Sequence, residues 1–415
     1  MTARTATPTE RWVALDAMRG LAALAVVLYH LRWDWHGHDL VHIRHAFYAV
    51  DFFFVLSGFV MAATYSAMRT PADLARFTLK RAGRLLPLHF AALAAFLALE
   101  TAVFLADRAG LSAGRETFSA FTGVMPLLAQ ATMTFGLIPG LDWMWNHPCW
   151  SIAVELWTYL LFGLTVLALR RGRIALWAGL SGLGLAAIAL APEGLATTSG
   201  PAIFRCLLSF FLGCLVHAAY ANVRGRAVRL GTREQVAVLA LAGLLVMLPA
   251  ESGWSLLVPF AFAGLVLGLA SDEGRVVRAF SARPLTRLGE LSFSIYLVHV
   301  PVWFAVENGL RGAAFSGLPW LLPDAAAAIP VMVSPFGSAL GADGLVLAYV
   351  GLVLTVAAWT HRWIETPARH WSRRLADRVG AFPVPPVPPV AALPTLRTAS
   401  SLSLTAAVMR SRTPR

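Results

Sequence analysis

Three ionisable residues lie within the first long apolar stretch of the chain, residues 13–31: Asp16, Arg19 and His30. An ionisable side chain in hydrocarbon is costly, and it is usually kept for work inside a helix bundle or a water-filled cavity. Arg19 and His30 are eleven residues apart, so in an α-helix they share a face and lie about 16 Å apart along the axis. Asp16 lies one turn before Arg19 on the same side. This helix face is therefore the candidate active surface.

A second basic pair, Arg81 and Arg84, lies one turn apart in the segment KRAGRLLP. Arginine binds phosphate oxygens well, because its planar guanidinium group donates several hydrogen bonds in a fixed geometry. The pair is a candidate phosphate clamp that faces the cytoplasm. The alternative is that both arginines only anchor the membrane topology, as basic residues near span ends commonly do.

Polar residues interrupt a later apolar segment, HPCWSIAVELWTYL, which covers residues 147–160. It contains Trp150, Ser151 and Glu155, and Glu155 lies about two turns inside the expected helix. A buried carboxylate needs a partner or a proton. A purely structural role for Glu155 alone is therefore disfavoured.

Two further apolar segments carry polar side chains. AVDFFFVLSGF contains Asp51 and Ser57, and for Ser57 a packing role is an equal alternative. LSFSIYLVHVP places Tyr296 and His299 three residues apart, on one helix face. Near the end of the apolar region, HRWIETPAR places Glu365 among arginines. The favoured interpretation is that Glu365 forms an ion pair with an arginine at the membrane interface.

Composition indicates a membrane protein with several spans. Of the 415 residues 58% are hydrophobic and 13% charged, whereas a soluble domain has about 25% charged residues. The net charge of +12 does not indicate nucleic-acid binding, because the arginines fall in short loops between apolar segments. The cysteines lack metal-ligand spacing, and no disulfide framework is expected.

Charge patterning predicts an all-α, polytopic helix bundle of about ten spans, at residues 13–31, 47–66, 85–105, 149–169, 174–191, 201–220, 235–250, 254–270, 291–310 and 345–363. Residues 118–137 are apolar but contain glycine and proline. Counting them as a span would place every later arginine cluster on the opposite side of the membrane from Arg81 and Arg84. The positive-inside rule therefore favours a re-entrant or interfacial segment there, with both termini in the cytoplasm. Residues 1–12 form a cytoplasmic lead, 13–376 the membrane domain, and 377–415 a disordered cytoplasmic tail rich in proline, serine and alanine.

Six motifs between residue 11 and about residue 370 occur together and in order: LDAMRGLAALAVVLYH, VDFFFVLSGFV, RAGRLLP, WSIAVELWTYL, LSFSIYLVHVP and IETPAR. In this combination the chain resembles the membrane acyltransferase-3 family. Members are polytopic enzymes that acylate exported saccharides, lipopolysaccharide, peptidoglycan or antibiotics. The arginine and histidine of the family motif match Arg19 and His30, and its two arginines three residues apart match Arg81 and Arg84. The extracellular hydrolase-like domain that some relatives carry is not visible in this sequence.

The resemblance implies transfer of an acyl group, with acetyl expected, from cytoplasmic acyl-CoA to a hydroxyl of a saccharide or glycoconjugate. It implies no bound cofactor or metal, and a place in the inner membrane of a bacterium. His30 would be the general base, Glu155 would orient His30 or bind the acceptor, and Arg19, Arg81 and Arg84 would bind the donor. Acceptor binding or structural support would fall to the remaining candidates: Asp16, Asp51, Ser57, Trp150, Ser151, Tyr296 and His299.

Two other functions stay open at this point. One is a transporter or flippase of a lipid-linked saccharide, and the other is acylation of a small molecule such as a macrolide. An acyl-enzyme intermediate on Ser57 or Cys149 is less favoured, because neither residue has an adjacent base in the sequence. The sequence leaves the acceptor, the acyl length and the oligomeric state undetermined.

Overall fold

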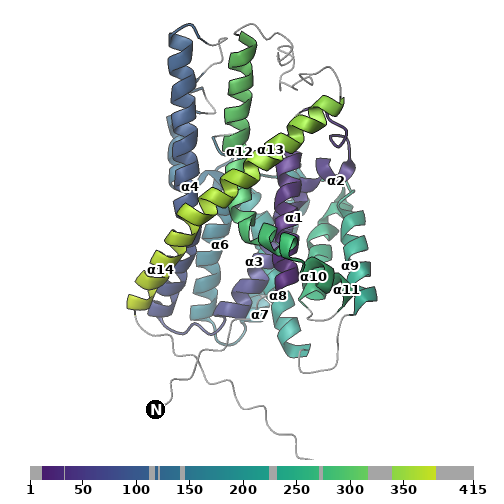
Figure 1. The fold of residues 1–415 in the computed structure, drawn as a ribbon. Helices are drawn as coiled ribbons and strands as arrows, with labels where there is room; N and C mark the ends of the chain where they lie inside the picture. Colours follow the sequence, from purple (N-terminus) through teal and green to yellow (C-terminus); the bar gives the residue numbers. More distant parts are fainter. Residues whose placement is uncertain are drawn as a thin grey trace, which may run out of the picture. The chain divides into compact units, whose positions relative to one another are not determined.

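The computed structural model describes residues 12–31, 33–111, 117–119, 122–140, 145–223, 231–270, 274–315 and 339–379, and these residues are mainly helical (Figure 1). The α-helices are α1 (Val13–Tyr29), α2 (Val41–Arg44), α3 (Ala49–Tyr65), α4 (Pro71–Arg108), α5 (Val124–Ala131), α6 (Cys149–Ala168), α7 (Arg173–Leu190), α8 (Ala202–Val223), α9 (Thr232–Leu245), α10 (Val258–Leu269), α11 (Arg275–Phe280), α12 (Arg283–Phe315), α13 (Ala339–Thr360) and α14 (Thr366–Arg378). Nearly all of the predicted N-terminal lead and of the C-terminal tail lies outside the described residues.

Seven helical stretches within the described residues are long and apolar enough to cross a membrane: Ala46–Tyr65, Pro71–Arg108, Cys149–Ala168, Arg173–Leu190, Ala202–Asn222, Arg283–Leu310 and Leu340–Arg378. The prediction of an all-α protein with several spans is confirmed. The three other expected spans correspond to α1, α9 and α10, which have 17, 14 and 12 residues. The total of ten spans stays a prediction.

The basic segment that was expected to connect two spans is part of a helix. α4 begins at a capping box, in which Thr70 accepts from the backbone N–H of Asp73 and Asp73 accepts from that of Thr70. It then runs for 38 residues, or about 57 Å, which is longer than the hydrocarbon core of about 30 Å. Arg81 and Arg84 therefore project from a continuous helix that extends, past Pro87, into the expected span.

The described residues between 118 and 137 form no long helix. The helix α5 has eight residues, about 12 Å in length, and a 3-10 turn at Phe135–Leu137 follows it. Side chains of α4 hold the segment, because His89 Nε2 lies 3.1 Å from the carbonyl oxygen of Gln130 and Glu100 accepts from Thr122 Oγ1 at 2.9 Å. This agrees with the prediction that the segment does not cross the membrane.

α1 and α12 pack closely, because Gly20 and Gly289 leave no side chain between the two backbones. A Cβ at Gly289 would overlap the carbonyl group of Asp16. Arg19 contacts Gly289 and His30 contacts His299, so the numbering rises in the same direction along both helices. This parallel arrangement is the one that the predicted order of spans requires.

A buried ion pair holds α3 against α8. Arg205 Nη2 lies 2.6 Å from Asp51 Oδ2, and the two side chains are 1% and 0% exposed. Arg205 also donates to the carbonyl oxygens of Thr197 and Phe47, and Ser209 donates to Asp51. Both charges are thus compensated where water is scarce. Asp51 has a structural role in this arrangement.

Replacing Gly289 by leucine should separate α1 from α12 and lower thermal stability, because the added side chain meets backbone atoms of Asp16. Overpacking of this kind costs about 1–3 kcal/mol. The measurement is the melting temperature of the purified protein in detergent. Gly179→Leu in α7 is the matched control, because a Cβ there meets nothing within 4 Å. Equal melting temperatures for the two variants would contradict the close packing.

Replacing Arg205 by methionine should lower stability by about 3–5 kcal/mol, because it leaves the Asp51 carboxylate buried without its cation. The double variant Arg205→Met/Asp51→Leu should regain much of that loss, since it removes both charges. Melting temperatures of the two single variants and the double variant complete the cycle. A double variant less stable than either single variant would show that the charge pair is not the cause.

Candidate active site

His30 ends α1 and lies against α12. Its Nδ1 is 2.9 Å from the carbonyl oxygen of Val26 and 3.3 Å from Nε2 of His299. Because a carbonyl oxygen only accepts, we assign the Nδ1–H tautomer to a neutral His30, which leaves a lone pair on Nε2. Tyr349 donates to the carbonyl oxygen of His299 at 2.7 Å, which fixes the neighbouring turn of α12.

A cavity of about 590 Å³, here named the histidine cavity, opens beside His30. Its walls include His30, His147, Trp150, Thr197, Arg205 and Tyr296. The guanidinium group of Arg205 lies over the ring of Trp150, 5.3 Å from its centroid. Two of the predicted residues, Trp150 and Tyr296, thus lie in the same cavity as His30.

A smaller cavity of about 110 Å³, the central cavity, is lined by most of the other predicted residues. Its walls include Arg19, Ser57, Arg81, Arg84, Ser151, Glu155 and Tyr296. Tyr159 donates to Glu155 Oε1 at 2.6 Å and lies 3.4 Å from Ser57 Oγ. Glu155 does not border the histidine cavity, and so the structure does not bring the two predicted catalytic residues together.

Tyr296 stands between the histidine cavity and the central cavity. Its hydroxyl group lies 2.8 Å from Ser151 Oγ and donates to the carbonyl oxygen of Pro148 at 3.0 Å. These contacts tie α12 to the beginning of α6. The predicted pair Tyr296 and His299 does share one face of α12, because their rings lie 5.9 Å apart.

A third cavity, the basic cavity, measures about 590 Å³ and lies at the Arg19 end of α1. Its polar walls are Asp16, Arg19, Arg84, Glu290, His361 and Arg369, together with Thr64. Arg19 is held by α12, since its Nε donates to Ser292 Oγ at 2.7 Å, and it forms an ion pair with Asp16 at 3.2 Å.

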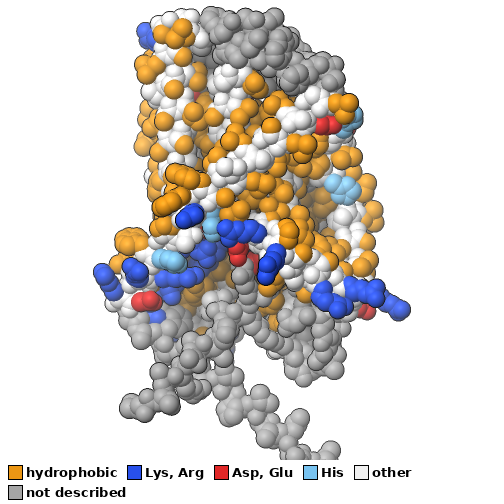
Figure 2. All heavy atoms as spheres, viewed as in Figure 1, with side chains coloured by type: hydrophobic (Ala, Val, Ile, Leu, Met, Phe, Trp, Pro, Cys, Tyr) orange, Lys and Arg blue, Asp and Glu red, His pale blue; other side chains and the backbone are white. Residues whose placement is uncertain are grey.

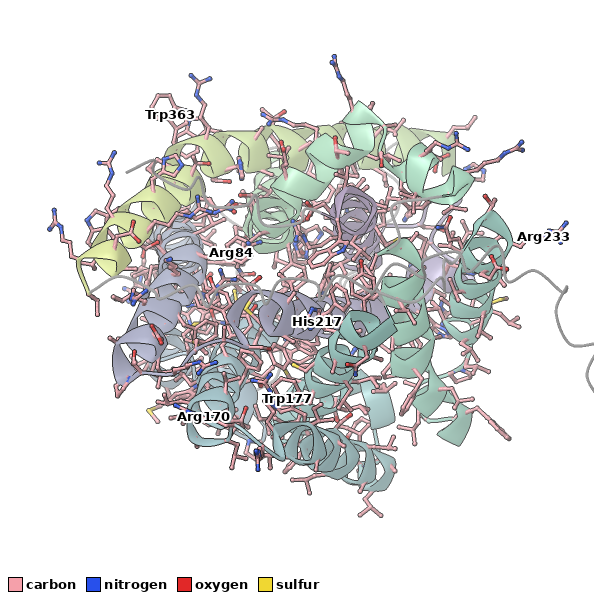
Figure 3. The ribbon with its side chains drawn as sticks, turned by 90° about the horizontal axis from the view of Figure 1, so that it is seen from below. Arg84, Arg170, Trp177, His217, Arg233 and Trp363 are labelled. Atoms are coloured by element: carbon pink, nitrogen blue, oxygen red, sulfur yellow. The ribbon has the colours of Figure 1, made fainter. Side chains whose placement is uncertain are left out.

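Arg84 differs from its neighbours in having no hydrogen bond or ion pair within the part of the chain that the structure describes. Figure 3 shows it inside the ring of helices, whereas Arg233 and Trp363 lie at the periphery. Arg81 lies beside Tyr65, whose hydroxyl group it contacts at 3.3 Å through Nη2. Of the predicted clamp, Arg84 thus has no partner within the described residues, whereas Arg81 has one long contact.

The three cavities form a series, because neighbouring cavities share walls. Tyr296 borders the histidine and central cavities. Arg19, Leu56, Val60 and Arg84 border the central and basic cavities. The series follows the face of α1 that carries Arg19 and His30, which confirms that the two residues share a face.

Several residues of the site were missed by sequence reasoning: Ser292, His361, Arg369 and above all Arg205. The signal for Arg205 was present, because an arginine within the apolar stretch AIFRCLLSFF is as costly as Arg19. The cysteines Cys149, Cys206 and Cys214 are free and buried. Within the described residues, no group of histidine, cysteine, aspartate or glutamate side chains could hold a metal ion.

Comparison with known proteins points to acyl transfer. Acyltransferase MdmB of Streptomyces mycarofaciens is 27% identical over 394 residues, which are 86% of this chain and 91% of that protein. BcsY of Komagataeibacter xylinus, described as a proposed membrane-bound transacylase, is 29% identical over 71% of this chain and 73% of its own. Protein 2 in the picA locus of Rhizobium radiobacter is 34% identical over 36% of this chain and 79% of that protein. No solved structure matches the chain.

The family comparison covers most of the membrane-spanning helices and most walls of the three cavities, whereas His361 and Arg369 of the basic cavity lie beyond it. The model of the acyltransferase-3 family, an acyltransferase domain, matches residues 12–360. This range contains Arg19 and His30, the arginines of α4, and Glu155. The chain therefore belongs to the acyltransferase-3 family of membrane acyltransferases.

Proposed function

We infer that this acyltransferase moves an acyl group, with acetyl expected, from acyl-CoA to a hydroxyl of a saccharide or glycoconjugate. The observation that carries the proposal is the series of cavities that joins arginine side chains to His30. Guanidinium groups suit the phosphates of the donor. An imidazole at the other end suits a general base.

The central cavity supports a donor with a slender arm. Beyond the arginines its walls combine apolar side chains, such as Phe53 and Leu56, with polar ones, such as Ser57, and its volume is only about 110 Å³. A pantetheine chain would thread this passage while the nucleotide stays at the basic end. The rise from Arg19 to His30, about 16 Å along the helix, is of the length that such an arm covers.

His30 would accept the proton of the acceptor hydroxyl on Nε2, because its Nδ1 faces the carbonyl oxygen of Val26. The hydroxyl oxygen then attacks the thioester carbonyl carbon, and a C–O bond forms. The C–S bond breaks, and the departing thiolate takes the proton from the imidazolium group. The products are the ester and free coenzyme A.

The histidine cavity supports a polyhydroxylated acceptor. Hydroxyl side chains of Thr197, Thr198 and Ser199 line one part of it, and the aromatic rings of Tyr29 and Phe47 line another. Hydrogen-bonding groups beside aromatic faces suit a sugar, which has hydroxyls at its rim and C–H groups on its faces. This lining favours a saccharide over a wholly apolar acceptor.

The basic cavity would face the cytoplasm in the inner membrane of a bacterium. In Figure 2, lysine and arginine side chains gather over α14 and the beginning of α12, below a broad hydrophobic region. The positive-inside rule assigns such an end to the cytoplasmic side. Acyl-CoA would then enter from the cytoplasm and the acceptor from the opposite side.

His30→Ala should lower the rate of acyl transfer by about 10²- to 10⁴-fold, the usual contribution of a general base. Product formation and release of coenzyme A thiol are measured on the purified protein in nanodiscs. His42→Ala is the matched control, because His42 is exposed and borders none of the three cavities. Near-normal transfer by His30→Ala would remove it as the base, and absence of thiol release from the unaltered protein would favour a transporter.

Arg84→Gln should raise the KM for acyl-CoA about tenfold or more and leave kcat little changed, because a phosphate contact is made equally in the ground and transition states. Steady-state kinetics with varied acyl-CoA test this. Lys80→Gln removes a charge from the same helix but borders none of the cavities, and it should behave as the unaltered protein. An altered membrane orientation without a change in KM would support the anchoring role instead.

A further inference from the structure

The C-terminal helix α14 contributes a residue to the basic cavity that the family match, residues 12–360, does not cover. Arg369 lines this cavity together with Arg84 of α4 and Arg19 of α1. Figure 1 shows α13 and α14 running in succession across the face of the bundle, with α14 ending beside α4. Three helices far apart in the sequence thus bring guanidinium groups to one space.

Close packing fixes α14 at the level of Arg84. A Cβ on Gly83 would overlap the side chain of Ser372, so the two helices touch one residue before Arg84. Ser372 follows Arg369 by one turn and donates to its carbonyl oxygen at 3.1 Å. Arg369 and Arg84 therefore project from facing helices at neighbouring levels.

The charges in the basic cavity are compensated unequally. Arg19 has Asp16 at 3.2 Å, and Glu290 has Arg287 at 2.9 Å. Arg84 has neither an ion pair nor a hydrogen bond in the described part of the chain. A second arginine beside Arg84, whose N–H donors make only long contacts within the protein, would complete an anion-binding site.

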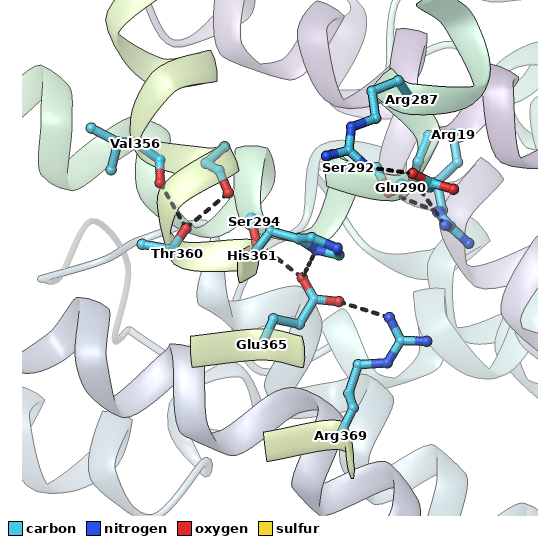
Figure 4. Close-up of polar contacts among 12 residues, drawn as sticks. Arg19, Arg287, Glu290, Ser292, Ser294, Val356, Thr360, His361, Glu365 and Arg369 are labelled. Carbon is cyan, nitrogen blue, oxygen red and sulfur yellow. Dashed lines mark hydrogen bonds and ion pairs between the residues drawn. The ribbon is translucent and has the colours of Figure 1, made fainter. Parts of the chain in front are cut away.

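Arg369 is such an arginine, because its contact with Glu365 is long. Its Nη1 lies 3.4 Å from Glu365 Oε1, whereas a charge-assisted hydrogen bond measures about 2.7–2.9 Å. Figure 4 shows that Glu365 has two other partners. Ser294 Oγ donates to its Oε2 at 2.9 Å, and His361 Nδ1 lies 3.0 Å from the same oxygen.

A π-helical turn places Glu365 in this position. Residues His361–Glu365 form the turn between α13 and α14, and Glu365 is 2% exposed. A π-turn adds a residue to the helix and is frequent at functional sites. If Arg369 moved away, Ser294 and His361 would still contact the Glu365 carboxylate. The buried carboxylate would therefore keep hydrogen-bond partners.

We propose that Arg369 and Arg84 together bind the phosphate groups of a nucleotide-carried acyl donor, and that the donor replaces Glu365 as the partner of Arg369. This inference rests on the proposed function and extends the donor site to α14. Phosphate is also the chemistry of anionic lipid headgroups, and the basic cavity lies at the end of a membrane-spanning bundle. The experiment therefore separates nucleotide phosphate from lipid phosphate.

The test measures binding of free coenzyme A to the full-length protein in phosphatidylcholine nanodiscs. Arg369→Gln should weaken binding about 10- to 100-fold, the effect of losing a hydrogen bond between charged groups. Arg369→Lys, which keeps the charge, should lose less and shows that the loss is not one of folding. Arg374→Gln is the matched control, because it removes one charge from the exposed side of the same helix and should change binding less than twofold.

Two further arms give the source of the phosphate. Pantetheine, which has no phosphate, should bind Arg369→Gln and the unaltered protein equally. If phosphatidylglycerol raises the melting temperature of the unaltered protein but not of Arg369→Gln, while coenzyme A binding is equal in both, the site binds lipid and the nucleotide assignment is overturned.

The remaining outcomes separate this inference from the proposed function. Equal coenzyme A binding by Arg369→Gln and Arg374→Gln, in a protein that still transfers acyl groups, overturns the inference alone. If the unaltered protein binds no coenzyme A, the proposed donor and the inference both fail. His30→Ala should bind coenzyme A normally, since His30 lies outside the basic cavity.

Discussion

Gly20 and Gly289 let the backbones of α1 and α12 touch, and this contact sets the geometry of the whole site. It brings Arg19 to Ser292 at one level and His30 to His299 at another. In a membrane, helices gain little from apolar contacts with one another, so close backbone approach and interhelical hydrogen bonds must hold them. Two parallel helices joined in this way form one wall along which the cavities lie in series.

Charge compensation separates structural residues from candidate ligand-binding residues. Arg205 contacts four partners, namely Asp51, Thr197, Phe47 and the ring of Trp150, so it has few donors left for a ligand. Arg84 and Arg369 do not have such complete sets of partners. An ionisable group inside a helix bundle is costly and is usually kept for a function. An arginine with few partners inside the protein is therefore a better candidate for ligand binding than an arginine whose donors are all used.

Local periodicity allowed part of this site to be predicted from the sequence. The common face of Arg19 and His30 follows from helix geometry alone. The prediction that residues 118–137 do not cross the membrane follows from the side on which the later arginine clusters would otherwise lie. Partners across the bundle could not be predicted, because 154 residues separate Asp51 from Arg205, and the separation of Glu155 from His30 depends on how α6 packs on α12. The π-turn rotates the residues that follow it by about 100° relative to a regular helix, so spacing alone misplaces Arg369.

The unequal volumes of the cavities bear on how a thioester would survive in this enzyme. The two outer cavities have about 590 Å³ each, whereas the central one has about 110 Å³. A donor arm that fills the small central cavity would also exclude water from it, and exclusion of water protects reactive groups from hydrolysis. Under the proposed function the acceptor then meets the acyl group only in the histidine cavity. The hydroxyl groups that line that cavity, and the reach of His30, would therefore select the acceptor, while the arginines would select the donor.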